Sequence, residues 1–351
     1  MIRFLAIGLH TLPSQSIVST IRSAKMTSLS GKRVLITGAT GFVGANLVRM
    51  ALKEGSEVYI ITRKESDKWR IDDVLTYIAE YNADFDVDLR DYNKLKCVIS
   101  RIKPEIIYHT ATFGGRPSQK DAIRIVQTNI IGTINLIKAC KKFGFDLFVN
   151  TGSSSEYGIK EKNMQEEDLL EPVNDYGASK SAATQYCQAI AKNEDLPIVT
   201  LRLFSPYGSY EESARLIPSV ILSCLRRKRP KISSPNFVRD FVYIQDVLDA
   251  YAKLSEIPQL GGEIFNIGSG KQCTIGDVAN KIIELSGYGI ELETGMPQGW
   301  PNEPKKWVAD ISKADDILGW KPRYDLEDGL AETIRWFRKN ISLYNNCRDA
   351  L

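Results

Sequence analysis

The chain has 351 residues, enough to bury one large core together with a smaller lobe. A formal net charge of +3 gives no argument for a nucleic-acid partner, and 43% hydrophobic residues without an apolar run of transmembrane length exclude a membrane span. The six cysteines form no CxxC pair, and two histidines are too few to complete a zinc site with them. We therefore expect no metal site, reduced thiols and a cytoplasmic protein.

Residues 1–30 differ in composition from the rest of the chain. They contain no Asp or Glu, and their apolar stretch at 4–9 is too short to span a membrane. An organellar transit peptide is one interpretation. We favour a disordered or non-native extension with Met26 as the working start, because the first predicted strand begins just after it.

From residue 31 onward, strand patterns alternate with helical patterns. Strands are predicted at 33–37, 57–61, 84–88, 105–109, 145–150 and 197–203, and helices at 42–54, 91–101, 120–142 and 176–192. This alternation is typical of an α/β fold with a doubly wound parallel sheet, and it defines a Rossmann-type core.

A glycine-rich turn, TGATGFVG at 37–44, joins the first strand to the first helix. Glycine permits positive φ and a close approach of the backbone, and the helix N-terminus offers free N–H groups to a pyrophosphate. An ordinary βα turn is the alternative, which the strand before it and the amphipathic helix after it disfavour. The residues expected to contact a dinucleotide here are Gly38, Thr40, Gly41, Phe42, Val43 and Gly44.

The second strand is followed by Thr62-Arg63-Lys64. An Asp or Glu at this place accepts hydrogen bonds from both ribose hydroxyls of NAD, whereas Arg63 suits the 2′-phosphate of NADP. NADP is therefore favoured as cofactor, NAD stays open, and a solvated strand end is the alternative interpretation of these cations.

Ser153, Tyr176 and Lys180 are the candidate catalytic residues. Tyr176 and Lys180 are four residues apart on a predicted helix, so they share a face, and the ammonium is expected to lower the pKa of the phenol. Lys180 is also expected to hold the nicotinamide ribose. Ser153 follows the strand at 145–150, and its hydroxyl is expected to bond the oxygen that gains or loses a proton. A surface Tyr-Lys pair is the alternative, which the serine cluster upstream disfavours.

After Phe204 the alternation becomes irregular, with a helix at 214–227, a strand and helix at 240–254, and a helix from Thr274. A smaller α/β substrate lobe, interwoven with the sheet domain, is predicted. The basic run LRRKRPK at 225–231 ends a helix, where cations favourably meet the helix dipole, and no aromatic residues interleave with it. The proposed division is 31–204 with 238–268 for the Rossmann domain, 205–237 with 269–340 for the lobe, and 341–351 for a tail.

Over residues 32–338 the chain resembles the extended short-chain dehydrogenase/reductases of the NAD-dependent epimerase/dehydratase family. The matching motifs, in order, are TGATGFVG (37–44), DLRD (88–91), HTAT (109–112), NIIGT (129–133), SSSEYG (153–158), DYGASK (175–180), RLFSPYG (202–208), RLIP (215–218), RDFVYIQD (239–246), FNIGSG (265–270) and ADISKADDILGWKP (309–322). The resemblance implies a nucleotide-diphosphate sugar as substrate, and a homodimer formed through helices 120–142 and 176–192.

The resemblance also implies contact roles for single residues. Asp88 and Leu89 are expected near the adenine, and Ala111 and Phe204 near the rest of the cofactor. The residues expected to bind the sugar nucleotide are Ser154, Ser205, Arg215 and Leu216, with Arg239 on its pyrophosphate.

Departures from the family pattern narrow the reaction. Family dehydratases carry an Asp-Glu pair where this chain has Ser154 and Ser155, whose hydroxyls cannot readily perform that proton transfer. Trp300 lies where sugar epimerases have a second phosphate-binding arginine. Lys305 and Lys306 are candidates to supply the positive charge that is missing there. The residues resemble CDP-abequose/paratose synthase-like reductases, which act on CDP-, GDP- or dTDP-linked 4-keto-6-deoxyhexoses. A 4-epimerase and a non-catalytic dinucleotide-binding sensor or scaffold are the alternatives.

Overall fold

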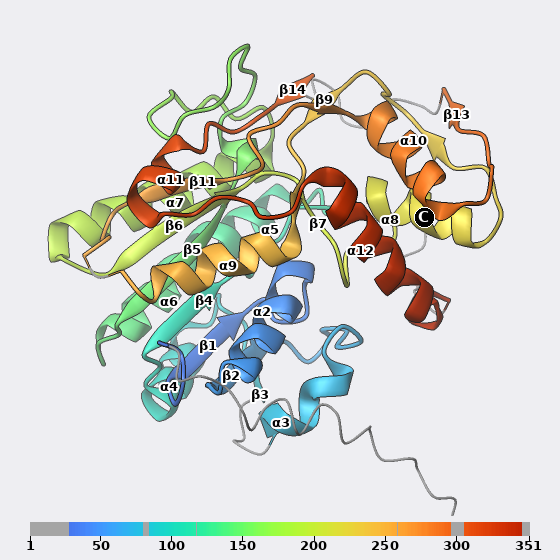
Figure 1. Cartoon of the computed structure of the whole chain (residues 1–351). Helices are drawn as coiled ribbons and strands as arrows, with labels where there is room; N and C mark the ends of the chain where they lie inside the picture. Colours follow the sequence, from blue (N-terminus) through green and yellow to red (C-terminus); the bar gives the residue numbers. More distant parts are fainter. Residues whose placement is uncertain (1–27, 80–83, 117, 258, 296–304, 346–351) are drawn as a thin grey trace, which may run out of the picture.

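The computed structural model describes residues 28–79, 84–116, 118–257, 259–295 and 305–345 (Figure 1). Most of the amino-terminal extension, Trp300 and the last six residues lie outside the described residues. A parallel sheet covered by helices on both faces forms the larger part of the molecule, and α8, α10 and α12 stand beside it as a separate group (Figure 1).

Within the described residues the sheet has seven strands in the order β3-β2-β1-β4-β5-β6-β11, and every neighbouring pair is parallel. The strands are β1 (Arg33–Thr37), β2 (Glu57–Thr62), β3 (Asp84–Asp86), β4 (Ile106–His109), β5 (Leu147–Ser153), β6 (Ile198–Leu203) and β11 (Ile264–Ile267). The order reverses between β1 and β4, which opens a crevice at their carboxyl ends. The predicted doubly wound sheet is confirmed, and β11 adds a strand that the alternation did not predict.

Helices cover the two faces because strand residues alternate between them. In β1, Val34 and Ile36 pack into one apolar cluster and Leu35 into the other. The helices on the first face are α2 (Phe42–Lys53), α9 (Ile244–Leu254) and α11 (Ser312–Leu318). Those on the second face are α4 (Tyr92–Ile102), α6 (Gly132–Lys141) and α7 (Asp175–Glu194).

The helix predicted over 120–142 contains a change of helical pitch. It runs as α5 (Ala122–Val126), a π-helical turn η2 (Gln127–Ile131) and then α6. Such turns occur often at functional sites. On α5 and η2 the side chains of Ile123, Val126 and Ile131 are exposed. This apolar surface belongs to the face expected in the homodimer, which stays a prediction.

The smaller lobe contains α8 (Leu216–Leu225), α10 (Ile275–Ser286) and α12 (Leu326–Lys339), which share a third apolar cluster. Its short strands and links to the sheet are β7 (Pro206–Tyr207), β8 (Lys231–Ile232), β9 (Val238–Arg239), β10 (Val242–Tyr243), β12 (Cys273–Thr274), β13 (Glu293–Thr294) and β14 (Lys306–Trp307). The remaining short elements are η1 (Asp72–Val74), α3 (Leu75–Ala79), η3 (Ser154–Glu156) and η4 (Ile341–Tyr344). Although the segment 269–340 is predicted for the lobe, its α11 packs on β11 at the sheet edge.

The basic run after α8 is engaged within the lobe. Arg226 donates to the Tyr344 carbonyl at 3.1 Å, Arg229 pairs with Glu291 at 2.6 Å, and Lys231 pairs with Glu293 at 2.9 Å. Within the described ranges, no helix combines the length and apolarity that crossing a bilayer requires, and no cluster of His, Cys, Asp or Glu is suited to a metal ion.

Candidate active site

A cavity of about 840 Å³ lies at the carboxyl ends of the strands, bordered by the sheet domain and the lobe. Most predicted site residues line it: Gly38, Thr40, Gly41, Phe42, Val43, Gly44, Arg63, Asp88, Leu89, Ala111, Ser153, Ser154, Tyr176, Ser205, Arg215, Leu216 and Arg239. The structure therefore brings together residues that are up to 201 positions apart in the chain, from Gly38 to Arg239.

Phe204 and Lys180 are the predicted site residues that do not line this cavity. The expectation for Phe204 is not supported, because its buried ring packs with Tyr157 and its N–H donates to the Ile267 carbonyl at 2.9 Å. Lys180 is buried in α7, four residues after Tyr176. It lies behind the residues that line the cavity.

The glycine-rich turn is packed too tightly for side chains. Gly38 has a φ of +73°, and a Cβ there would lie 2.6 Å from the Ala111 nitrogen at the end of β4. A Cβ on Gly44 would lie 2.2 Å from the Gly38 carbonyl oxygen. The turn is thus pinned between β1, β4 and α2.

The N-terminus of α2 faces the cavity with no side chain to cap it. Its N-cap is Gly41, no side chain accepts from its first N–H groups, and its first turn holds no acidic residue. Uncapped N–H groups at the positive end of a helix dipole bind phosphate well. The chain is therefore suited to hold the pyrophosphate of a dinucleotide at this turn.

Arg63 and Asp88 lie where the adenosine end of a dinucleotide is expected. Arg63 follows β2 and pairs with Glu65 at 3.6 Å. Asp88 accepts from Arg90 through both carboxylate oxygens, at 3.0 and 2.8 Å. Burial raises the pKa of Asp88, but the hydrogen bonds and charge of Arg90 outweigh it, so the net pKa lies below its usual range. Asp88 therefore stays ionised beside Arg63.

Ser153 and Tyr176 both line the cavity and lie next to each other. Ser153 is the last residue of β5, and its Oγ accepts from the Ser155 N–H at 3.1 Å. Tyr176 is the second residue of α7, which begins where the Asn174 side chain accepts from the Gly177 N–H at 2.8 Å. The side chains of Ser153 and Thr112 are hydrogen-bonding partners of the phenol. A substrate oxygen can thus contact the serine and the tyrosine together.

The expectation that the pKa of Tyr176 is lowered is wrong. Burial raises the pKa of the phenol, and this effect exceeds the lowering by Ser153, Arg215 and Thr112. Burial also lowers the pKa of Lys180, which weakens the lysine as a source of positive charge. Tyr176 is therefore held in its protonated form at neutral pH.

Asn129 is a site residue that sequence reasoning missed. Its amide nitrogen donates to the Phe113 carbonyl and to Ser179 Oγ, both at 2.8 Å, and its Oδ1 accepts from the Phe113 N–H at 2.8 Å and from Thr112 Oγ1 at 3.2 Å. The residue therefore ties η2, the loop after β4 and α7 to one another. The NIIGT motif that begins with Asn129 was the available signal.

Two contacts join the loop after β4 to the segment before α8. Arg215, the N-cap residue of α8, donates from Nη2 to the Gly115 carbonyl at 2.5 Å. Arg116 pairs with Glu212 at 2.8 Å. All four residues line the cavity, so these contacts connect its sheet side to its lobe side.

Arg239 is 5% exposed and stacks against aromatic rings, with its guanidinium 4.7 Å from the Trp307 ring centre and 5.6 Å from that of Phe237. Stacking orients the guanidinium, whose planar set of N–H donors suits anions. The compensating role considered for Lys305 and Lys306 is not supported, because neither lines the cavity and Lys306 donates to the Glu161 carbonyl at 3.3 Å.

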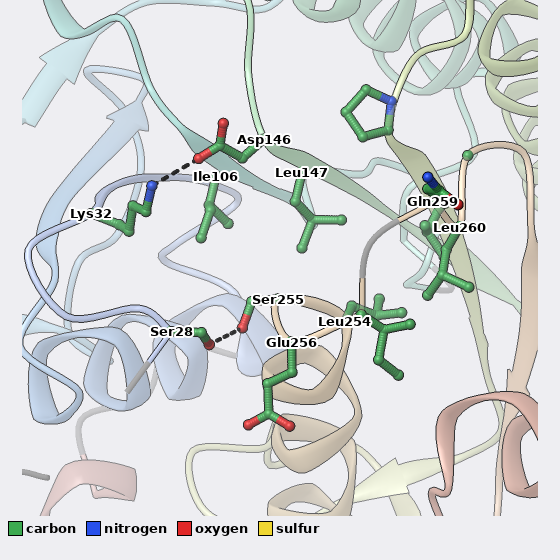
Figure 2. A pocket seen from close by; sticks show the side chains of 14 residues that line it. Ser28, Lys32, Ile106, Asp146, Leu147, Leu254, Ser255, Glu256, Gln259 and Leu260 are labelled. Carbon is green, nitrogen blue, oxygen red and sulfur yellow. Dashed lines mark hydrogen bonds and ion pairs between the residues drawn. The ribbon is translucent and has the colours of Figure 1, made fainter. Parts of the chain in front are cut away.

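A smaller cavity of about 240 Å³ lies at the opposite edge of the sheet, by the amino ends of β4, β5 and β6 (Figure 2). Its polar groups are satisfied locally, since Lys32 pairs with Asp146 at 2.9 Å and Ser28 contacts Ser255 at 2.6 Å (Figure 2). None of the predicted site residues lines it. The larger cavity is therefore the candidate active site.

The model of the NAD dependent epimerase/dehydratase family matches residues 34–268, more than half of the chain. The chain belongs to this family. It is an NAD(P)-dependent enzyme of the oxidoreductase type, with a Rossmann-like fold.

The chain is similar to relatives with different reactions. A UDP-glucuronate 4-epimerase of Thermodesulfobacterium geofontis is 29% identical over 328 residues, covering 90% of this chain and 98% of the relative. A dTDP-glucose 4,6-dehydratase of Haemophilus influenzae is 27% identical over 346 residues, covering 88% and 98%. Nucleotide-sugar chemistry is common to these relatives, and the reaction differs between them.

Solved structures show the same fold. The UDP-glucuronic acid 4-epimerase of Bacillus cereus, in complex with UDP-glucuronic acid and NAD, superposes with a TM-score of 0.76 at 28% identity, over 88% of this chain and 99% of that one. The UDP-glucose 4-epimerase of Thermotoga maritima, with UDP-glucose, gives a TM-score of 0.79 at 25% identity over the same shares.

Proposed function

We propose that this protein is a nucleotide-sugar 4-ketoreductase that reduces the C4 carbonyl of an NDP-linked 4-keto-6-deoxyhexose. The observation that carries the proposal is the composition of the turn beside Tyr176. Ser153, Ser154 and Ser155 line the cavity, whereas the acidic residue of the same turn, Glu156, is fully buried and does not. The turn thus offers hydroxyls for one oxygen and no carboxylate for the C5 and C6 proton transfers of a dehydratase.

Each side chain has a defined part in the reduction. When bound, the nicotinamide dinucleotide supplies the hydride that C4 accepts. Tyr176 donates its proton to the C4 oxygen, and Ser153 donates a hydrogen bond to that oxygen. The raised pKa of the buried phenol keeps it protonated, which is the form that the reductive direction requires. Lys180 then supplies charge as the phenolate forms.

Binding of the nucleotide diphosphate is assigned to the lobe side of the cavity. Arg215 and Leu216 lie at the start of α8. Arg239 lies on β9, and its guanidinium stacks on the ring of Trp307. Guanidinium groups bind phosphate through paired N–H donors. Ser205, with a φ of +30° after β6, precedes these groups in the chain and lines the same cavity. This arrangement favours a diphosphate-linked sugar over a free one.

We predict a preference for NADPH that depends on Arg63. Losing a charge-assisted contact to the 2′-phosphate costs roughly 1.5 to 3 kcal/mol, so Arg63→Ala is expected to weaken NADPH binding about 10- to 100-fold and to leave NADH binding nearly unchanged. Titration of both dinucleotides by intrinsic fluorescence measures this.

The matched control for Arg63 is Arg90→Ala. Arg90 is also partly exposed and paired with a carboxylate, Asp88, but it does not line the cavity. Its removal is expected to change the affinities for NADPH and NADH by the same factor. Equal affinity of the unmutated protein for the two dinucleotides would contradict the role of Arg63.

A 4-epimerase is the second candidate function. Two observations favour it: the similar Bacillus cereus 4-epimerase contains NAD, and Glu65 lies in the cavity lining next to Arg63. A carboxylate at this end of β2 suits the ribose hydroxyls of NAD. A 4-epimerase returns the hydride to the same sugar, so it consumes no reduced cofactor.

The reaction itself separates the two candidates. With a CDP-, GDP- or dTDP-linked 4-keto-6-deoxyhexose, the ketoreductase is expected to oxidise one reduced dinucleotide for each sugar reduced. The loss of absorbance of the reduced nicotinamide measures this oxidation. Interconversion of UDP-glucose and UDP-galactose, or of their uronic or N-acetyl relatives, without net cofactor consumption would establish the epimerase instead.

A further inference from the structure

Glu156 is a buried carboxylate directly beside the proposed catalytic residues. It is 0% exposed, ends the short 3₁₀ turn η3, and does not line the cavity. An isolated buried carboxylate is costly, so its neighbours reveal what it does.

One carboxylate oxygen holds the end of β5. Glu156 Oε1 accepts from the Ser153 N–H at 2.8 Å, while Ser153 Oγ accepts from the Ser155 N–H, and the two bonds form a capping box around η3. The same Oε1 also accepts from Thr184 Oγ1 of α7 at 3.1 Å. Glu156 thereby links the backbone of Ser153 to the helix that carries Tyr176.

The other oxygen is paired with a buried arginine. Arg202 Nε on β6 donates to Glu156 Oε2 at 2.8 Å, and Arg202 Nη1 donates to Tyr157 Oη at 2.8 Å and to the Glu166 carbonyl at 3.1 Å. Both charged groups have partners, so the ion pair is stable within the core. The close packing extends to Gly152, where a Cβ would lie 2.7 Å from Glu156 Oε1.

The charge of Glu156 acts on both titrating catalytic groups. Burial raises the pKa of Tyr176, and Glu156 raises it further, against the lowering by Ser153, Arg215 and Thr112. Burial lowers the pKa of Lys180, and Glu156 with Cys187 opposes this. Lys180 also acts on His109 of β4, whose pKa is lowered by burial and further by the charge of the lysine.

We propose that Glu156 is a positioning residue for catalysis: it fixes Ser153 at the end of β5 and places one negative charge behind the Tyr176 and Lys180 pair. This rests on the catalytic roles proposed above for Ser153 and Tyr176. The proposed role also explains why the carboxylate of Glu156 is buried instead of lining the cavity. From there it orients Ser153, the residue whose hydroxyl donates to the substrate oxygen.

The first test separates charge from position. Glu156→Gln retains an acceptor for the Ser153 N–H but removes the charge, so the pKa of Tyr176 is expected to fall. Because the reduction needs the protonated phenol, the loss of kcat on raising the pH then occurs at lower pH than in the unmutated enzyme. If kcat fell at the same pH as in the unmutated enzyme, or at a higher pH, the proposed effect of the Glu156 charge would be refuted.

The second test removes the capping box. The double variant Glu156→Val with Arg202→Leu replaces the ion pair by apolar groups, a change that buried pairs often tolerate. A small misplacement at a reacting centre costs up to about 100-fold, so kcat is expected to fall about 10- to 100-fold while dinucleotide affinity is retained. The comparison variant Thr184→Val removes the contact of Glu156 to α7 and leaves the Ser153 contact, so it is expected to lower kcat less than the double variant does. A double variant with unchanged kcat would overturn the positioning part.

A measurement without substrate separates this proposal from the proposed reaction. Tyrosine-ring NMR of the complex with dinucleotide, assigned through Tyr176→Phe, reports the titration of Tyr176 directly. A lower pKa in Glu156→Gln supports the inference even if no 4-keto sugar is reduced, and an unshifted titration overturns it even if one is.

Discussion

Tyr176→Phe is expected to lower turnover by about 10²-fold or more, with little change in dinucleotide affinity. The ring stays in place in α7, and the proton that reaches the sugar oxygen is lost together with the contacts to Ser153 and Thr112. Steady-state kcat and the dinucleotide Kd, measured separately, give the two quantities.

Tyr108 offers the matched control for this variant. Its hydroxyl is buried and has no hydrogen-bond partner among the described residues, and its ring packs edge-on against Tyr251 away from the cavity. Tyr108→Phe therefore removes a buried hydroxyl without removing a proton donor, and it is expected to leave turnover unchanged. If Tyr176→Phe retained near-normal turnover, another residue would have to protonate the sugar.

Gly44→Ala is expected to weaken dinucleotide binding by about 100-fold, which corresponds to about 3 kcal/mol. The added methyl group would lie 2.2 Å from the Gly38 carbonyl oxygen, and a backbone atom cannot rotate away as a side chain can. The phosphate-binding turn must therefore move away from α2. Titration with NADH and NADPH measures the loss, and far-UV circular dichroism reports whether the fold is retained.

Gly276→Ala is the corresponding change in another helix. Gly276 is the second residue of α10, where a Cβ would lie 3.2 Å from the Pro235 carbonyl oxygen, a contact that small shifts relieve. Its dinucleotide affinity is expected to match that of the unmutated protein. A Gly44→Ala protein that is folded and binds dinucleotide normally would contradict the assignment of the pyrophosphate to this turn.

Local patterns predicted the fold well where strand, turn and helix are neighbours in sequence. The unit from β1 through α2 to β2 is one example, because its apolar periodicity and its glycines act over short distances. The strand β11 has Asn266 in its middle and reaches the sheet only after the chain has passed through the first part of the lobe, including α8. Its pairing with β6 depends on tertiary packing, which local periodicity does not encode.

The candidate site likewise contains residues that local patterns predict and residues whose roles depend on tertiary contacts. Gly38, Ser153 and Tyr176 were found because each belongs to a short motif. Glu156 and Asn129 also act through partners 46 and 50 positions away, Arg202 and Ser179, and no short window of sequence contains those bonds. The pKa of Tyr176 was predicted with the wrong sign because helical spacing places Lys180 near it but does not reveal the burial of both groups.

The chain passes between the sheet domain and the lobe several times, and these passages are joined to each other. β7 pairs with β10, and Tyr207 contacts α12, where a Cβ on Gly329 would lie 2.0 Å from its hydroxyl oxygen. A hinge between two bodies needs connections that bend together with little resistance. Here the connections are packed against one another, so we expect them to resist a change in the angle between the two parts. We therefore expect the proposed sugar nucleotide to enter by rearrangement of the contacts that Arg116 and Arg215 make across the cavity, with side chains at its rim moving more than the two parts of the fold.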